Sequence, residues 1–305
     1  MHRLGCCDRL TRYVGNGSNS THKGEHSVHL TQRFIRFSLA AGIGLIATAA
    51  GAQTAQSVPS QEPFTPTVGQ AGKDVVWVPT PNALVEKMLD MAKVTPQDYV
   101  MDLGSGDGRN IIAAAKRGAA AVGVEYNPDM VELSKRDAAA QGVADKATFV
   151  QGDMYEADIS KATVLALFLL PHNLNKLVPK FLALRPGSRI VANTFAPEGW
   201  TPDETETISG DCVSWCTSLL WIVPAPVEGT WKMPQGELTL KQEFQMVSGT
   251  MTSGDASTPV SGKLRGDLIS FTAGNTEYAG RVTGDSMAGT IQGATNGNWT
   301  ATRLR

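Results

Sequence analysis

The chain of 305 residues predicts an α/β fold with a mostly parallel sheet and an antiparallel edge strand, followed by a small all-β region. Two observations carry this prediction. Between residues 99 and 225, short apolar runs alternate with amphipathic segments, the order that builds a parallel sheet with helices packed on it. After residue 226 the helical periodicity ends, and twelve glycines divide the last 80 residues into alternating segments. This pattern indicates an antiparallel meander or a small barrel of six to eight strands.

Each element of the α/β region has its own local signature. Residues 81–93 carry apolar side chains at helical spacing, with Thr80 as the expected N-cap and Pro81 at the first helical position. Pro179 is expected to kink or divide the last helix of the region. Strands are expected at 99–103, 120–125, 146–151, 162–170, 188–195 and 217–225, and the other helices at 110–118, 128–141 and 173–184.

The stretch Tyr99–Gly108, YVMDLGSGDG, predicts a ligand site. A strand runs into a glycine turn and then into a helix, which lets a ligand approach the backbone closely. The spacing GxGxG departs from the GxGxxG of dinucleotide sites, and an acid within the turn is a poor neighbour for a pyrophosphate. Two acids, Asp102 and Asp107, flank the glycine turn. They suit a ligand with a positive centre and an amino-acid end, so we expect S-adenosylmethionine (SAM). The expected contacts here are Asp102, Gly104, Ser105, Gly106, Asp107 and Gly108.

Two more acids follow the next two expected strands. Glu125 comes 19 residues after Gly106 and is placed to accept hydrogen bonds from both ribose hydroxyls, a feature that NAD enzymes share. Asp153, with Met154 beside it, comes where an adenine amine can be met. Tyr126 is expected to stack on the adenine, with plain packing as the alternative. The competing interpretation of the whole pattern is an ordinary doubly wound fold without a ligand.

Residues 75–225 resemble the class I SAM-dependent methyltransferases, which have a Rossmann-like fold. More narrowly, Val78-Pro79-Thr80, Asp102–Arg109 (DLGSGDGR) and Gly123–Asn127 (GVEYN) are similar to the motifs of bacterial relatives of a protein-lysine methyltransferase family best known from mitochondria. This resemblance covers about half of the chain. It implies SAM as the cofactor and a protein lysine as the methyl acceptor. It also implies that Thr80 contacts either the cofactor or the acceptor.

The acceptor pocket is expected beyond the fourth strand, at residues 167–173. Leu170-Pro171-His172 stands where many class I enzymes have a polar-proline-aromatic motif, which argues against methylation of a nucleic-acid base. His172 is a candidate base, with a capping or surface role as the alternative, and Asn173 is a further candidate. No general base is obligatory, because alignment and desolvation of an amine supply much of the catalysis. The expected pocket wall consists of Trp77, which is equally a core residue, and Leu170, Pro171 and Phe195.

The N-terminal residues 1–52 have the pattern of a signal peptide with a long n-region. Arg33 and Arg36 precede sixteen apolar or small residues that end in Ala50-Gly51-Ala52. We expect cleavage after Ala52 and a periplasmic or secreted protein, with a retained membrane anchor as the alternative. The expected domains that follow are a polar linker at 53–72, the methyltransferase domain at 73–225 and the all-β domain at 226–305.

Composition narrows the classes of ligand. Beyond residue 52 the chain holds 21 Lys and Arg against 27 Asp and Glu, so it has no basic footprint for a nucleic acid. His172 is the single histidine left there, and Cys212 and Cys216 are the two cysteines. These residues are too few for a His and Cys metal site, so no metal is expected. In an oxidising compartment the two cysteines are expected to form a disulfide, with free thiols as the alternative.

The sequence therefore favours an exported SAM-dependent methyltransferase that acts on a protein lysine. Two alternatives remain open. One is a small-molecule methyltransferase with the same cofactor site, and the other is a non-catalytic envelope binding protein on a methyltransferase scaffold. The expected partner is a protein or small-molecule acceptor, and a membrane is involved only if the signal segment is uncleaved.

Overall fold

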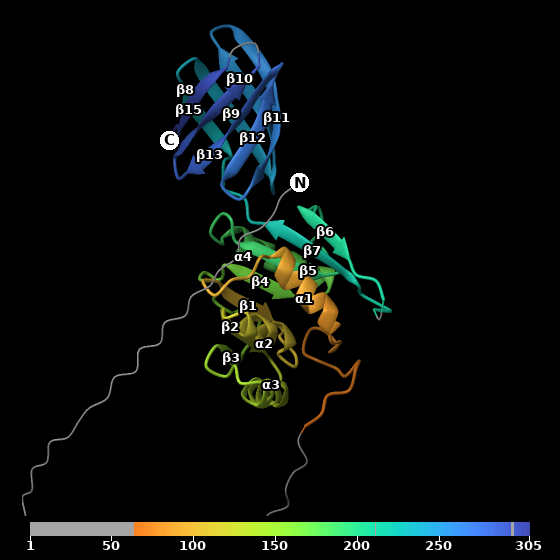
Figure 1. Cartoon of the computed structure of the whole chain (residues 1–305). Helices are drawn as coiled ribbons and strands as arrows, with labels where there is room; N and C mark the ends of the chain where they lie inside the picture. The colour runs from red at the N-terminus through yellow and green to blue at the C-terminus, as the bar shows by residue number, and fades with distance from the viewer. Residues whose placement is uncertain (1–63, 211, 294–295) are drawn as a thin grey trace, which may run out of the picture. The chain divides into compact units, whose positions relative to one another are not determined.

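The computed structural model describes residues 64–210, 212–293 and 296–305. The expected signal peptide and the first part of the expected linker lie outside the described residues. Figure 1 shows two regular parts within them, an α/β sheet and a closed β-barrel. Within these ranges, no helix is long and apolar enough to cross a membrane.

The sheet has seven strands in the order β3-β2-β1-β4-β5-β7-β6. Strands β1 to β5 are parallel, whereas β7 runs antiparallel to both β5 and β6. The expected antiparallel strand is therefore β7, and one further strand, β6, lies outside it and runs in the direction of β5. The strand β6 was missed because its four residues, ETET, are polar and exposed and show no apolar alternation. The bounds are β1 Tyr99–Leu103, β2 Ala120–Glu125, β3 Ala147–Gln151, β4 Val164–Leu167, β5 Arg189–Asn193, β6 Glu204–Thr207 and β7 Thr217–Ile222.

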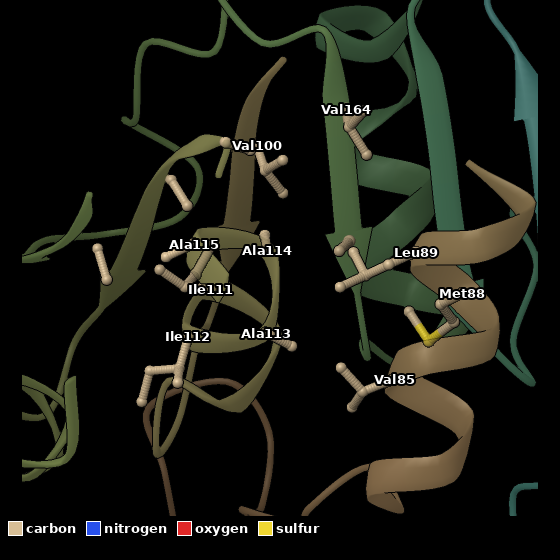
Figure 2. Close-up of a cluster of buried hydrophobic side chains, with 14 of the residues drawn as sticks. Val85, Met88, Leu89, Val100, Ile111, Ile112, Ala113, Ala114, Ala115 and Val164 are labelled. Carbon is tan, nitrogen blue, oxygen red and sulfur yellow. The ribbon is translucent and has the colours of Figure 1, made fainter. Parts of the chain in front are cut away.

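Four helices flank this sheet: α1 Asn82–Met91, α2 Arg109–Lys116, α3 Pro128–Ala140 and α4 Pro171–Leu182. Apolar side chains of α1, α2 and α3 share one buried cluster, and those of α4 belong to a second cluster. Figure 2 shows the first cluster, with Met88 and Leu89 of α1 gathered with Ile111 of α2 against Val100 and Val164 of the sheet. The sheet thus has a buried cluster on each face.

Two local predictions for these helices need correction. Pro81, not Thr80, is the N-cap of α1, and no side chain caps that helix. Thr80 instead turns its side chain to Asn193, as described below. Pro179 lies inside α4 without dividing it. One missing backbone hydrogen bond is tolerated there because Leu177 and Phe181 on the opposite side of the helix are buried in the second cluster.

The C-terminal part is a closed barrel of eight antiparallel strands. Closure leaves no strand edge open for further pairing. Gly249 lies between the inward residues Val247 and Met251, and a Cβ on it would stand 1.9 Å from the carbonyl oxygen of Thr239. Such inward glycines let the strands of a small barrel bend. The bounds are β8 Gly229–Met233, β9 Gly236–Glu243, β10 Met246–Ser253, β11 Ala256–Arg265, β12 Leu268–Ala273, β13 Thr276–Thr283, β14 Ser286–Gln292 and β15 Gly297–Arg303.

Candidate cofactor and acceptor site

A pocket lies at the carboxyl ends of β1, β2 and β3, next to the point where the strand order reverses between β1 and β4. Ligands of open α/β sheets bind at such points. The space within it, open mouth included, is about 890 Å³. Most of its lining residues belong to the glycine turn after β1, to the segments after β2 and β3, and to the N-terminal segment Gln70–Thr80.

The glycine turn has a backbone that other residues adopt with difficulty. Gly104, Gly106 and Gly108 have φ values of +74°, +56° and +78°. A Cβ on Gly106 would lie 2.8 Å from the indole nitrogen of Trp77. The turn therefore packs closely against Trp77, which lines the pocket.

Asp102 is a buried carboxyl group in the pocket wall, only 3% exposed. Its Oδ2 accepts a hydrogen bond of 2.9 Å from the Asn110 amide, whereas its Oδ1 is buried without a partner among the described residues. Burial raises the pKa of Asp102 well above its ordinary value, and the nearby carboxylates of Glu125 and Asp107 raise it further. A ligand that brings a positive charge and hydrogen-bond donors would satisfy this group.

Glu125 is held in place by the backbone of the site. Its Oε2 accepts from the Gly106 N–H at 2.9 Å, and its Oε1 accepts from the Asn127 N–H at 2.9 Å. Each carboxylate oxygen keeps a further lone pair, so both can still accept hydroxyl groups of a ligand. The side chain is thus preorganised and lies in the pocket lining.

Asp153 forms an ion pair with Lys73, and its other oxygen accepts from the Tyr155 N–H at 2.9 Å. The Lys73 hydrogen bond holds the pKa of Asp153 below its usual value. The Lys73 ammonium also lies 5.0 Å from the ring centre of Tyr126, which is 53% exposed. Met154 is buried in the pocket lining beside these residues. Lys73 was missed because it stands at the border of the predicted linker.

The N-terminal segment folds back over the pocket. The Gly69 N–H donates to the Trp77 carbonyl and the Trp77 N–H donates to the Gln70 carbonyl, both at 2.9 Å. Residues 70–72, which composition assigned to a linker, therefore line the pocket. This segment covers the glycine turn.

Thr80 and Asp107 each have partners that the sequence did not indicate. The Thr80 carbonyl accepts from the Arg109 guanidinium at 2.7 Å, and its hydroxyl accepts from the Asn193 amide at 3.3 Å. Arg109 also forms an ion pair with Asp107. Asp107 is therefore charge-compensated within the protein and does not face a ligand alone. Ser105, a further pocket residue, has a buried hydroxyl without a partner among the described residues.

Four residues named for the acceptor pocket, Leu170, Pro171, His172 and Asn173, do not line this pocket. Leu170 is the N-cap of α4, and Pro171 and His172 are exposed in its first turn. Asn173 is fully buried and donates to the Tyr155 hydroxyl at 2.8 Å. The pocket residue from the expected range 167–173 is Phe168, directly after β4, which its apolar neighbours did not let the sequence single out.

Phe195, expected in the pocket wall, is stacked on Phe168 with ring centroids 6.1 Å apart.

Cys212 and Cys216 are joined by a disulfide. In the part of the chain that the structure describes, no three His, Cys, Asp or Glu side chains come together as metal ligands.

Comparisons with known proteins point to one family. The ANTKMT methyltransferase domain model matches residues 102–204. A protein-lysine N-methyltransferase of Saccharolobus islandicus (strain REY15A) is 44% identical over 133 residues, which are 43% of this chain and 83% of that protein. An adenine nucleotide translocase lysine N-methyltransferase of Mus musculus is 33% identical over 120 residues, 39% of this chain and 52% of that protein. The chain thus spans about half the length of that mammalian relative.

Among solved structures, an RNA methyltransferase from Salinibacter ruber in complex with S-adenosyl-L-homocysteine has 44% sequence identity. It covers 49% of this chain and 96% of its own, with a TM-score of 0.46.

Proposed function

Because this chain belongs to the class I SAM-dependent methyltransferases, in the family of the ANTKMT domain and the archaeal protein-lysine N-methyltransferase, we propose that it methylates the side-chain amine of a protein lysine. The observation that carries the proposal is the 44% identity to that archaeal enzyme over 83% of its length. When bound, SAM supplies a methyl group on a sulfonium centre that leaves readily. The chain's own residues bind SAM, orient the acceptor amine toward the methyl group and remove water from that amine.

The pocket residues fit this cofactor. The unpartnered oxygen of buried Asp102 suits the positive charge of SAM, and the fixed carboxylate of Glu125 suits its ribose hydroxyls. Trp77 over the glycine turn excludes water from the reacting end of SAM.

A lysine acceptor reacts as the neutral amine, and apolar surroundings lower the pKa of that amine. His172 is exposed and outside the pocket lining, so desolvation, not a histidine base, supports the reaction.

Labelled SAM tests the acceptor class. The full-length chain is incubated with methyl-labelled SAM and an extract of the source cells, with the Glu125→Ala variant as the matched control. Label in the protein fraction, released by hydrolysis as N-methyl-lysine and absent in the control, is the expected result. Label confined to RNA, lipid or small molecules would contradict the lysine proposal, and no transfer despite SAM binding would favour the non-catalytic alternative.

Replacing Glu125 by alanine is expected to weaken SAM binding by about 2–4 kcal/mol, because charge-assisted hydrogen bonds to hydroxyls are lost. The ligand-free protein should also lose about 1–2 kcal/mol of stability, because the Gly106 and Asn127 N–H groups lose their acceptor. Calorimetric titration and denaturant unfolding measure the two effects. Glu125→Gln keeps one acceptor oxygen and should recover part of both, whereas unchanged SAM affinity in Glu125→Ala would refute the ribose assignment.

We further propose that the protein acts outside the cytoplasm. The basic, apolar and small-residue order of Arg33–Ala52 supports export, and a disulfide at Cys212–Cys216 persists best in an oxidising compartment. Cell fractionation with N-terminal sequencing should find the protein in the envelope or medium, beginning at Gln53. A cytoplasmic protein that retains residues 1–52 would contradict export.

A further inference from the structure

An aromatic cluster of three residues lies beside the cofactor pocket. Phe168 follows β4 and lines the pocket, Phe195 follows β5, and Trp215 precedes β7. The Phe168 ring centroid is 6.1 Å from that of Phe195 and 6.1 Å from that of Trp215. Phe195 is nearly parallel to Phe168, at 13°, and Trp215 is tilted from it by 59°. The cluster is therefore continuous with the pocket through Phe168.

The reversed direction of β7 places Trp215 at this edge. Since β7 is antiparallel to β5, its first residues lie beside the last residues of β5, with Ser218 paired to Asn193. The loop that precedes β7 is thereby carried to the carboxyl edge, where the cofactor pocket opens. The Ile208 N–H donates to the Cys216 carbonyl at 2.9 Å and closes the base of that loop.

The disulfide-closed loop Cys212–Cys216 holds Trp215 in an unfavourable state. Its φ is +55°, a strained value for a bulky residue, and the side chain is 42% exposed. Thr194, next to Phe195, has a φ of +60°. Strained residues that persist at the edge of a ligand pocket are a known mark of function.

We propose that Phe168, Phe195 and Trp215 form the subsite that receives the acceptor lysine side chain, with Trp215 as a positioning residue held by the Cys212–Cys216 disulfide. This rests on the proposed function. The occupant is argued from chemistry: aromatic faces attract an ammonium or methylammonium group, and their apolar surface packs against a four-carbon stem. Contact with Phe168 leads that stem to the pocket that holds the cofactor. Acceptor binding, unlike cofactor binding, then depends on the disulfide.

Three variants of the full-length chain test the subsite: Trp215→Ala, the double change Cys212→Ser with Cys216→Ser, and Val213→Ala as the matched control. Val213 belongs to the same loop and is 95% exposed. The probe is a peptide library with one fixed central lysine and blocked ends, used with labelled SAM. Binding of the same library to protein loaded with S-adenosylhomocysteine is measured in parallel by fluorescence anisotropy, which needs no turnover.

Trp215→Ala should raise the KM and the Kd for the peptides about tenfold, with kcat and the Kd for S-adenosylhomocysteine within about twofold. The double serine variant should shift KM in the same direction, and Val213→Ala should change neither constant. Unchanged peptide constants in Trp215→Ala, while the wild type methylates the library, would overturn the subsite alone. A wild type that binds S-adenosylhomocysteine but neither binds nor methylates the library would overturn the proposed function and the subsite together.

Discussion

The Gly108→Ala variant is expected to lose about 3 kcal/mol of its free energy of unfolding. Gly108 has a φ of +78° at the start of α2, and a Cβ there would stand 2.6 Å from the ring of Phe149 and 2.9 Å from the Cβ of Ser134. Both neighbours are buried, with exposures of 4% and 0%. The left-handed backbone and the overpacking each contribute to the loss. Denaturant unfolding monitored by circular dichroism measures it.

Gly142→Ala is the matched control for this variant. Gly142 has a φ of +71°, but no atom lies within 4 Å of the position that its Cβ would take. It should lose only about 1 kcal/mol, the contribution of the left-handed backbone. Equal losses in the two variants would show that the contact between the turn and β3 is looser than described.

The Asp102→Asn variant is expected to be more stable than the wild type without ligand and much weaker in SAM binding. Burial penalises the Asp102 carboxylate, and asparagine retains an oxygen to accept from Asn110. Removal of the charge should therefore raise the free energy of unfolding by about 1–3 kcal/mol at pH 7.5. SAM affinity should fall about tenfold to a hundredfold, because the positive ligand loses its buried counter-charge.

The direction of the Asp102 pKa shift determines how the stability gain of Asp102→Asn varies with pH. The folded protein binds the Asp102 proton more tightly than the unfolded chain, whose Asp pKa is about 3.9. The stabilisation of the folded state by that proton is complete below this pKa and is lost as the pH rises through the raised folded pKa. The gain in Asp102→Asn should therefore grow with pH over that range. A gain that does not vary with pH would refute the explanation.

The carboxylates that line the pocket were predictable from the sequence, whereas the aromatic cluster beside the pocket was not. Asp102, Glu125 and Asp153 are found in order because each lies in or just after a parallel strand, and parallel strands bring their carboxyl ends to one edge. Lys73 and the cover of the pocket were missed because their positions depend on contacts distant in the sequence, not on local periodicity.

The aromatic cluster that we propose as the acceptor subsite depends on a strand pairing that the sequence does not display. The sequence pointed to Leu170–Asn173 because those residues follow β4 directly. The antiparallel pairing of β7 with β5 brings Trp215 to Phe168 instead. The all-β character of the last region was predictable because its glycines and alternating residues are regular. Its closure into a barrel was not, because closure depends on the pairing of β8 with β15, which are far apart in the sequence.

The reversal of β7 also bears on how such an enzyme can diversify. The pocket is lined mainly by β1 to β3 and the segments after them, and the disulfide-closed loop Cys212–Cys216 precedes β7 at the far end of the sheet order. Substitutions, insertions or a lost disulfide in that loop leave every pocket-lining carboxylate untouched. With the acceptor subsite proposed for Trp215, related chains can keep one methyl-donor pocket unchanged while this loop varies, and acceptor choice can evolve separately.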